Sequence, residues 1–317
     1  MVVSIRKKAS MPRNAHEHNP SVADVFDTFL ADCRGRYNLS ANTVKSYRAD
    51  LGLVAQMLTL PIQDITLREI EQFLAMRDEK PATTNRRIAS LRRFFLWAQR
   101  QGYCVKNPMV LVEPKQDDER LPRPIRLHHE LRALDAAIQS AEQPFRLMFT
   151  MLRETGMRAG EVVQLNVGDV VLDLGREGLR VREAKNNRER IVVLTSDEMP
   201  RTMRGLRTFL RELGSNVPAT TPLFRSNRGT RLSYDALHYQ WERVCRTANL
   251  IDVVEGKEQP RYTLHQLRHT VGSNLITQLP EQIVSRMLGH RDPRSTRRYA
   301  EVTEDQVRVA LAQKRKR

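Results

Sequence analysis

The sequence HQLRH at residues 265–269 is followed by LGH at residues 288–290 and then by Tyr299. The first histidine and the arginine of HQLRH are three residues apart, so a helix would carry both side chains on one face. Thr263 and Gln266 fit a capping box, which predicts that this helix begins directly before the motif. The glycine of LGH is predicted to end another helix, because glycine is common at that position. This part of the chain therefore predicts a helical region that gathers histidine, arginine and tyrosine side chains.

Two segments upstream supply further basic side chains. The sequence TGMRAGE at residues 155–161 places Arg158 after a glycine turn at the start of a predicted helix, and Glu161 is expected to orient that arginine. Farther along, the sequence AKNNRER at residues 184–190 lies between two stretches of alternating apolar and polar residues. Such alternation predicts two strands, and the paired asparagines are typical of a turn. We therefore expect a β-hairpin with Lys185 near its tip.

These residue types suit the exchange of a phosphodiester bond. Arg158 and Arg268 offer planar guanidinium groups, which can bind two phosphate oxygens at once. His265 and His290 can add hydrogen bonds and help to move the proton of the attacking group. Tyr299 is the candidate nucleophile: the ordinary pKa of a tyrosine is about 10, and cationic surroundings would favour its phenolate. A phosphotyrosine intermediate conserves the energy of the bond, so rejoining would require no ATP.

Lys185 is the candidate general acid of this set. It is the only lysine between Lys115 and Lys257, in a stretch that otherwise uses arginine for its positive charges. An arginine stays protonated at any working pH, whereas a lysine can release its proton. We therefore expect Lys185 to protonate the departing 5′ oxygen of a cleaved strand. The alternative is an ordinary solvated lysine in a turn.

The composition favours a nucleic-acid partner and predicts neither a metal ion nor a cofactor. The 317 residues include 53 Lys and Arg against 37 Asp and Glu, and the formal charge of +16 suits a polyanion. No apolar run reaches the roughly 20 residues of a membrane span, and the polar start lacks the apolar core of a signal peptide. We therefore expect a cytoplasmic, nucleoid-associated protein. The three separated cysteines fit no metal or disulfide pattern, and no glycine-rich nucleotide loop occurs.

The chain separates into two predicted domains. Apolar residues recur at helical spacing over four stretches of the first part, which predicts an all-α bundle. Ser40 as a cap, and Thr66 with Glu69 as a capping box, predict where two of these helices begin. The sequence EPKQDDERLPRP, rich in prolines and charges, then has the composition of a linker. Beyond it, one hairpin and several helical patterns, including one that begins at Ser196, predict an α+β domain. The expected limits are 1–20 for a polar leader, 21–112 for the helical domain, 113–124 for the linker, 125–302 for the α+β domain and 303–317 for a C-terminal tail.

The order and spacing of these motifs resemble those of the tyrosine recombinases, the family of phage integrases, Xer-type recombinases and transposon resolvases. That family combines an arginine in a TGxRxxE context, a hairpin lysine, HxxRH, LGH and a tyrosine, which follows LGH here by nine residues. In the first domain, NTVKSY at residues 42–47 and TNRRIASLRRFF at residues 84–95 resemble two helices of the family's core-binding domain. The resemblance extends over residues 21–305. Ala184 stands where many members have glycine, and Met157 where many have leucine.

The resemblance implies a multi-domain fold: an all-α, SAM-like core-binding domain, then a mainly helical α+β catalytic domain with a small antiparallel sheet. It implies a recombinase that cuts duplex DNA at specific core sites through a 3′-phosphotyrosyl bond, for integration, excision or resolution of DNA such as mobile elements. The expected assembly is a synaptic homo-tetramer, with a related recombinase as an optional partner. The catalytic residues would be Arg158, Lys185, His265, Arg268, His290 and Tyr299. Glu161 would support them, and His269 would be either a supporting or a structural residue. The expected DNA contacts are Thr43, Lys45, Tyr47, Arg86, Arg87, Arg92 and Arg93, although these arginines also fit a solvated helix face.

Two other interpretations share part of this pattern. A type IB topoisomerase or a telomere resolvase would use the same chemistry without joining two sites. A non-catalytic DNA-binding regulator would keep the motifs as relics. The modest length of the chain and its Xer-like first domain argue against the former, and the complete set of motifs argues against the latter. An integrase, a transposon recombinase and a resolvase of chromosome or plasmid dimers all share the motifs.

Overall fold

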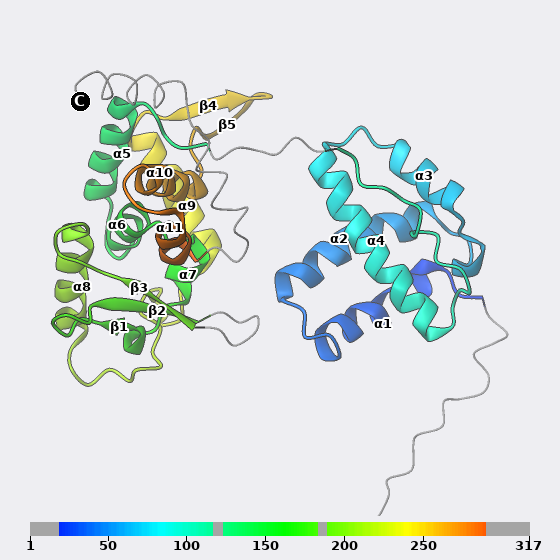
Figure 1. Ribbon diagram of the computed structural model, residues 1–317, viewed down its shortest axis with the longest axis horizontal. Helices are drawn as coiled ribbons and strands as arrows, with labels where there is room; N and C mark the ends of the chain where they lie inside the picture. The colour runs from blue at the N-terminus through cyan, green and yellow to red at the C-terminus, as the bar shows by residue number, and fades with distance from the viewer. Residues whose placement is uncertain (1–18, 117–122, 183–188, 290–317) are drawn as a thin grey trace, which may run out of the picture. The chain divides into compact units, whose positions relative to one another are not determined.

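The computed structural model of the protein describes residues 19–116, 123–182 and 189–289 (Figure 1). The chain divides into two compact units, residues 1–119 and residues 120–317. The division falls inside the segment of residues 113–124, whose prolines and charges favour an extended chain. Each unit has an apolar core of its own.

The first unit is a helical bundle, as the spacing of its apolar residues predicts. Ser40 caps the second helix, because its Oγ accepts a hydrogen bond from the Thr43 amide at 3.2 Å. Glu69 closes the capping box of the third helix by accepting from the Thr66 amide at 2.9 Å. Both predicted helix starts are thus confirmed. The elements are α1 (Val22–Gly35), α2 (Ala41–Met57), η1 (Ile62–Asp64), α3 (Leu67–Ala75) and α4 (Pro81–Gln101).

Aromatic side chains fill the centre of this first unit. Phe29 of α1 packs edge-on against Phe94 and Trp97 of α4, with ring centroids 5.4 and 5.3 Å apart. Nε1 of Trp97 donates to Asp32 at 2.7 Å, so the polar atom of the indole is paired. These contacts join α1 to α4 across the core of the bundle.

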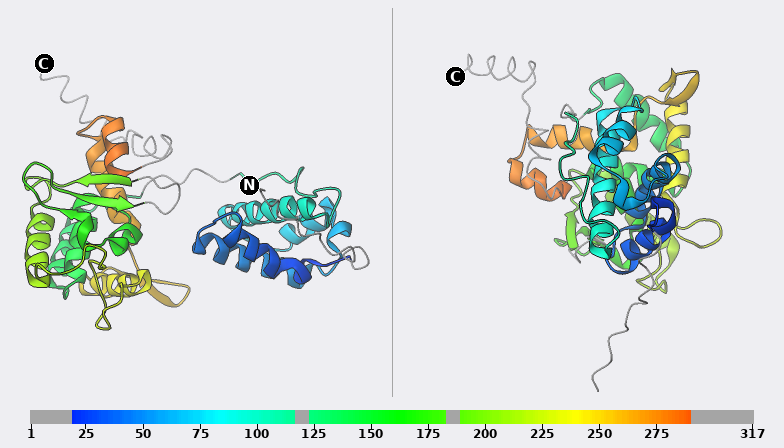
Figure 2. Two further views of the ribbon diagram at one scale, coloured as in Figure 1. Left: turned by 90° about the horizontal axis from the view of Figure 1, so that it is seen from below. Right: turned by 90° about the vertical axis from the view of Figure 1, so that its right-hand side faces the viewer.

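The second unit is built around one buried helix, α6. Every residue of α6 from Leu147 to Leu152 is buried, as expected for a helix surrounded by others. Helices α5, α8 and α10 pack against it, and Figures 1 and 2 show it in the middle of this unit. The helices of the unit are α5 (His128–Ser140), α6 (Phe145–Thr155), α7 (Ala159–Gln164), α8 (Pro200–Leu213), α9 (Tyr234–Thr247), α10 (Leu264–Ile276) and α11 (Glu281–Leu288).

A small antiparallel sheet covers one side of the second unit, and it includes the predicted hairpin. Its strands β1 (Val170–Val171), β2 (Gly178–Arg182) and β3 (Glu189–Val193) follow the 3-10 turn η2 (Val167–Asp169). Arg180 of β2 pairs with Ile191 of β3. Leu179, Val181 and Val192 point inward and are buried, which confirms the period-two pattern. The residues that connect β2 to β3, 183–188, lie outside the described part of the chain.

Two features of the second unit differ from the sequence expectations. The helix expected from Ser196 begins at Pro200, because Thr195 forms a turn in which its Oγ1 accepts from the Glu198 amide at 3.3 Å. A second hairpin, β4 (Ile251–Val254) and β5 (Lys257–Pro260), was not expected, because its strands are short and mostly exposed. Its two-residue turn, Glu255 and Gly256, has positive φ values of 52° and 74°, as a type I′ turn requires.

Candidate active site

Arg158 lies where α6 ends and α7 begins. Gly156 ends α6 in the left-handed conformation, with φ of +65°, which glycine adopts without a steric penalty. Thr155 fixes this turn, because its Oγ1 donates to the Met151 carbonyl at 2.6 Å and accepts from the Met157 amide at 3.2 Å. Arg158 then occupies the N-cap position of α7 in an extended conformation. Its side chain stays 40% exposed, so the guanidinium can be reached from solvent.

Glu161 holds Arg158 from the first turn of α7. One carboxylate oxygen accepts from the Arg158 amide and the other from Arg158 Nη1, both at 2.9 Å. Burial by itself would raise the pKa of Glu161, but the hydrogen bonds and charge of Arg190, together with Arg158, lower that pKa below its ordinary value. Glu161 therefore remains a carboxylate with both oxygens bound to arginines, in agreement with an orienting role.

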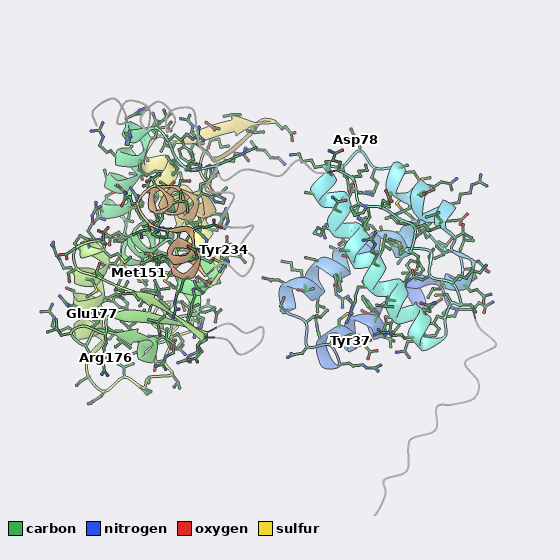
Figure 3. The ribbon with its side chains drawn as sticks, in the orientation of Figure 1. Tyr37, Asp78, Met151, Arg176, Glu177 and Tyr234 are labelled. Carbon is green, nitrogen blue, oxygen red and sulfur yellow. The ribbon has the colours of Figure 1, made fainter. Side chains whose placement is uncertain are left out.

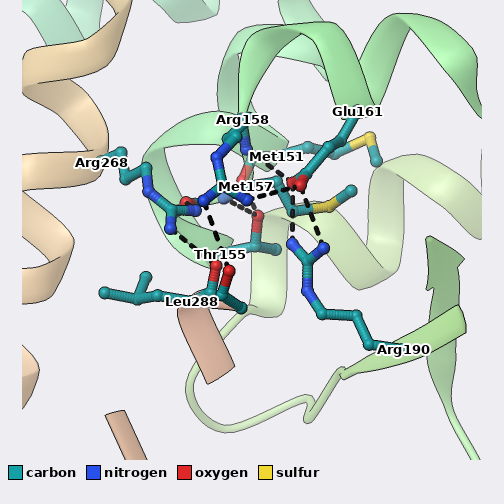
Figure 4. Close-up of polar contacts among 10 residues, drawn as sticks. Met151, Thr155, Met157, Arg158, Glu161, Arg190, Arg268 and Leu288 are labelled. Carbon is teal, nitrogen blue, oxygen red and sulfur yellow. Dashed lines mark hydrogen bonds and ion pairs between the residues drawn. The ribbon is translucent and has the colours of Figure 1, made fainter. Parts of the chain in front are cut away.

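Arg268 joins the TGMRAGE, HQLRH and LGH segments. This residue of α10 is 2% exposed, and its Nη1 and Nη2 donate to the carbonyls of Gly156 at 2.9 Å and Leu288 at 2.6 Å (Figure 4). The helices approach closely here: a Cβ at position 156 would lie 2.9 Å from Leu288 Cδ2 and 3.0 Å from Val271 Cγ1. In Figure 4 the guanidinium groups of Arg158 and Arg268 lie beside each other at this junction. The packing thus places two planar cations, suited to phosphate, in one place.

His265 and His269 lie on the first turns of α10, with their rings nearly perpendicular and the ring centroids 4.5 Å apart. His265 is exposed at the surface, yet the atoms packed beside its ring desolvate it and lower its pKa, and the charges of Arg268 and Arg158 lower it further. Desolvation also lowers the pKa of the half-buried His269 to about 4, with contributions from His265 and Arg268. Both rings are therefore neutral at neutral pH, when each has one donor and one acceptor nitrogen.

Arg190 is a residue of this site that the sequence analysis did not assign. It lies on β3, and its Nη1 and Nη2 donate to the two oxygens of Glu161 at 3.0 and 2.7 Å. The sequence does contain a signal for it: the alternation along β3 places Arg190 on the same inward face as Val192. An inward-facing arginine requires a buried partner.

Three predicted catalytic residues, Lys185, His290 and Tyr299, lie outside the described residues. Two other tyrosines of the unit are described. Tyr262 donates its hydroxyl hydrogen bond to Glu130, and burial followed by that carboxylate raises its pKa to about 12. Tyr234 lies at the start of α9 and is 49% exposed (Figure 3).

The predicted DNA contacts on α2 differ in exposure. Thr43 is half-buried, and its Oγ1 lies 2.8 Å from Ser40 Oγ at the helix cap. Lys45 is exposed. Tyr47 stacks on Phe29 with the ring centroids 5.9 Å apart, and burial raises the pKa of its hydroxyl. Lys45 is thus the side chain of this group that α2 presents to solvent.

Two of the four arginines predicted to face DNA form ion pairs within the first unit. Arg87 is 3% exposed, and its guanidinium bonds to Glu79, with Asp50 at 3.6 Å. Two carboxylates inside the bundle occupy this guanidinium, so the structure gives no support to the predicted DNA contact of Arg87. Arg86 bonds to Asp50 at 2.5 Å and keeps a side chain that is 44% exposed.

The other two arginines, Arg92 and Arg93, lie farther along α4. Arg92 is exposed and donates to the carbonyl of Val112. Arg93 lies over the ring of Tyr37, with 4.2 Å between its Cζ and the ring centroid (Figure 3 labels Tyr37). Both keep contact with solvent, so the prediction of DNA contact stands for them and for Arg86.

An apolar groove lies on the second unit beside β3. It has a volume of about 470 Å³, and its wall includes the end of α10, α11 and the outward face of β3. The side chains of Ile191, Val193 and Ile283 are 49%, 61% and 47% exposed along it. Such a cluster of exposed branched side chains is typical of a surface that another segment covers.

Within residues 19–116, 123–182 and 189–289, no group of three or more His, Cys, Asp or Glu side chains is placed to hold a metal ion. Across the same described part of the chain, every helix is too short or too polar to cross a membrane.

Comparisons with known proteins follow the two units. Residues 126–306, more than half of the chain, match the model of the phage integrase family, and residues 26–102 match that of its N-terminal SAM-like domain. The tyrosine recombinase XerD of Staphylococcus saprophyticus is 28% identical over 297 residues, covering 90% of this chain and 96% of XerD. XerD of Yersinia pestis is 27% identical over 305 residues, covering 92% of this chain and 96% of that protein.

Solved structures show the same fold. The XerH recombinase in a post-cleavage complex with its difH substrate has a TM-score of 0.68 at 21% identity, over 92% of this chain and 84% of that one. A lambda integrase tetramer bound to a Holliday junction has a TM-score of 0.68 at 19% identity, over 89% of this chain and 78% of that one. The expected fold class is therefore confirmed. The chain belongs to the phage integrase family and is a tyrosine recombinase, an enzyme of site-specific DNA recombination.

Proposed function

We propose that this recombinase cuts duplex DNA by attack of Tyr299 on a phosphodiester, leaving a 3′-phosphotyrosyl bond and a free 5′ hydroxyl, without a metal ion or ATP. The observation that carries this proposal is the position of Arg268. Its hydrogen bonds to the carbonyls of Gly156 and Leu288 place a second guanidinium beside Arg158, at the point where the segments of the motif meet. Two adjacent planar cations match the non-bridging oxygens of one phosphate.

Each residue has a role in the balanced reaction. The phenolic oxygen of Tyr299 forms a bond to phosphorus as the bond from phosphorus to the 5′ oxygen breaks. Arg158 and Arg268 stabilise the charge that grows on the non-bridging oxygens. His265, neutral at neutral pH, and His290 hydrogen-bond to the phosphate and help to accept the phenolic proton.

Lys185 supplies a proton to the departing 5′ oxygen in this proposal. The oxygen would otherwise leave as an alkoxide, and the very high pKa of water shows how poorly such an oxygen carries a negative charge. Rejoining runs the same steps backwards, with a 5′ hydroxyl as the nucleophile. The bond energy kept in the phosphotyrosine drives it.

The relatives support a DNA partner and a tetrameric assembly for this chain. XerH and lambda integrase have been solved on DNA, and lambda integrase also as a tetramer on a Holliday junction. We propose that this chain binds duplex core sites with both domains, residues 21–112 and 125–302, and forms a synaptic tetramer. Lys45, Arg86, Arg92 and Arg93 would contact the DNA from the first domain. We place the reaction in the cytoplasm, on nucleoid DNA.

The test begins by mapping covalent adducts of the wild-type protein across the host replicon and any resident mobile element, which yields the site. On a nicked suicide substrate carrying that site, Tyr299→Phe should bind and shift the DNA but form no covalent complex. Wild-type protein should form the complex in excess EDTA. A trapped adduct at Tyr234 or Tyr262 would refute the assignment of the nucleophile, and a strict requirement of cleavage for magnesium would refute the mechanism.

A further inference from the structure

One carboxylate is shared by two arginines at the start of α7. Nη1 of Arg158 and Nη1 of Arg190 donate to Oε1 of Glu161 at 2.9 and 3.0 Å. The amide of Arg158 and Nη2 of Arg190 donate to Oε2 at 2.9 and 2.7 Å. Both oxygens of Glu161 therefore bind both residues, and Figure 4 shows the carboxylate between the two side chains.

The two arginines differ in what else they can reach. The Arg158 side chain is 40% exposed, while that of Arg190 is 16% exposed. Arg190 is also enclosed on its other side: Gly289 ends α11 with φ of +67°, and a Cβ there would overlap the Arg190 guanidinium. Arg158 Nη2 donates to the Gly289 carbonyl at 3.3 Å. Arg190 is thus held between Glu161 and the backbone of Gly289, whereas Arg158 keeps a face for a ligand.

The charges of this cluster explain why a second arginine is needed. Glu161 orients Arg158, but a carboxylate that paired with Arg158 alone would also cancel its positive charge. A cancelled guanidinium attracts a phosphate less strongly. Because Arg190 binds the same carboxylate, two positive charges and one negative charge leave a positive charge at the site.

We infer that Arg190 is a positioning and charge-balancing residue of the cleavage site: it neutralises Glu161, so that Glu161 can orient Arg158 without cancelling its charge. Arg190 itself does not touch the DNA. Desolvation would raise the pKa of Glu161, and the hydrogen bonds and charge of Arg190 lower it, which is the effect of the same interaction on the carboxylate. This inference rests on the proposed role of Arg158 as a phosphate ligand.

The inference predicts that one substitution compensates another. Arg190→Gln removes the balancing charge and should slow single-turnover cleavage by roughly tenfold to a hundredfold. Adding Glu161→Gln restores the net charge of the cluster, so the double variant should cleave faster than Arg190→Gln alone. If Arg190 only stabilised the fold, the double variant would cleave more slowly than Arg190→Gln. The double variant loses all four hydrogen bonds to the Glu161 carboxylate, whereas Arg190→Gln alone loses two of them.

A second measurement uses a substrate whose scissile phosphate carries a methyl group in place of one non-bridging oxygen. This phosphate has no negative charge, so the defects of Arg190→Gln and of Arg158→Ala should both shrink on it. The matched control is Arg153→Gln, which breaks another partly buried two-bond pair, with Asp135 at 3.0 and 3.4 Å. This control should lower the melting temperature but cleave both substrates at nearly the wild-type rate.

The outcomes separate the two proposals. If Arg158→Ala cleaves the normal substrate at the wild-type rate, the proposed role of Arg158 fails. If Arg158→Ala is impaired and the double variant is no faster than Arg190→Gln, the inference about Arg190 is overturned and the proposed function stands. Should Arg190→Gln not fold, Arg190→Lys and the double variant decide, because both keep the wild-type net charge. Each must then cleave within about tenfold of wild type, and a larger loss in both refutes the inference.

Discussion

Two glycines of the segment at residues 155–161 should respond to alanine in opposite directions. Gly156 has a φ of +65°, and a Cβ there would lie 2.9 Å from Leu288 Cδ2 and 3.0 Å from Val271 Cγ1. A left-handed alanine costs about 1–2 kcal/mol, and forcing a methyl group into packed side chains costs about 1–3 kcal/mol. The lower entropy of the unfolded chain offsets about 0.4–1 kcal/mol of this cost. Gly156→Ala should therefore lower the free energy of unfolding of the second unit by about 1–5 kcal/mol.

Gly160 is the matched control, because it lies in the exposed first turn of α7. Apart from its chain neighbours and the backbone of its own helix, no described atom lies within 4 Å of where a Cβ would be. Gly160→Ala should leave stability unchanged or raise it by up to about 1 kcal/mol.

Scanning calorimetry of the full chain measures both effects. For a unit of this size, each kcal/mol moves the melting temperature by about 2–4 °C. The transition of the second unit should fall by about 2–20 °C in Gly156→Ala, while the transition of the first unit stays in place. Cleavage at a temperature where the variant is folded should also fall, because the Gly156 carbonyl accepts a hydrogen bond from Arg268. Equal melting temperatures for the two glycine variants would refute the packing argument.

Three further predictions concern proton transfer, pH and assembly. Lys185→Ala should cleave normal DNA slowly and recover cleavage when sulfur replaces the bridging 5′ oxygen, because a thiol with a pKa near 8.5 leaves without a proton. Arg158→Ala should stay impaired on both substrates. If sulfur does not rescue Lys185→Ala, another residue is the general acid. The pKa of His269 in the folded chain lies below its ordinary value, at about 4. The unfolded chain therefore binds the proton first, and stability should fall as the pH drops from about 6.5 towards 4. The melting temperature of His269→Gln should depend less on pH in this window, and the same pH dependence as wild type would contradict the lowered pKa. The sequence of residues 303–317 contains a capping-box pattern and a short apolar face, and a helix of this length is only marginally stable alone. We therefore expect the segment to dock on a neighbouring protomer, with the groove at β3 as the candidate receptor. Its deletion should leave DNA binding by the monomer intact and weaken synapsis in gel shifts, whereas a deleted chain that no longer folds would show that the segment packs within its own domain.

The sequence determined much of the local structure of this protein. The capping boxes at Thr66 and Thr263 appear where the spacing of Thr with Glu or Gln predicts them, because a cap depends on residues within one helical turn. The hairpin of β2 and β3 also follows from a local pattern, the alternation of side chains on a strand. The candidate catalytic residues were identified in the same way, from motif order and the chemistry of each side chain. The hairpin of β4 and β5 was not predicted, because its strands are only four residues long, mostly exposed, and lack that alternation.

The tertiary structure decided which charged groups meet. With 53 Lys and Arg in the chain, a sequence does not specify which arginine pairs with which carboxylate. Arg87 looked like its neighbours on α4, yet packing buries it against Glu79 and Asp50. Arg190 lies 29 residues from Glu161 and shares it with Arg158. Capping and strand alternation act over a few residues and can be read in order along the chain, whereas these ion pairs depend on how helices and strands distant in sequence pack together.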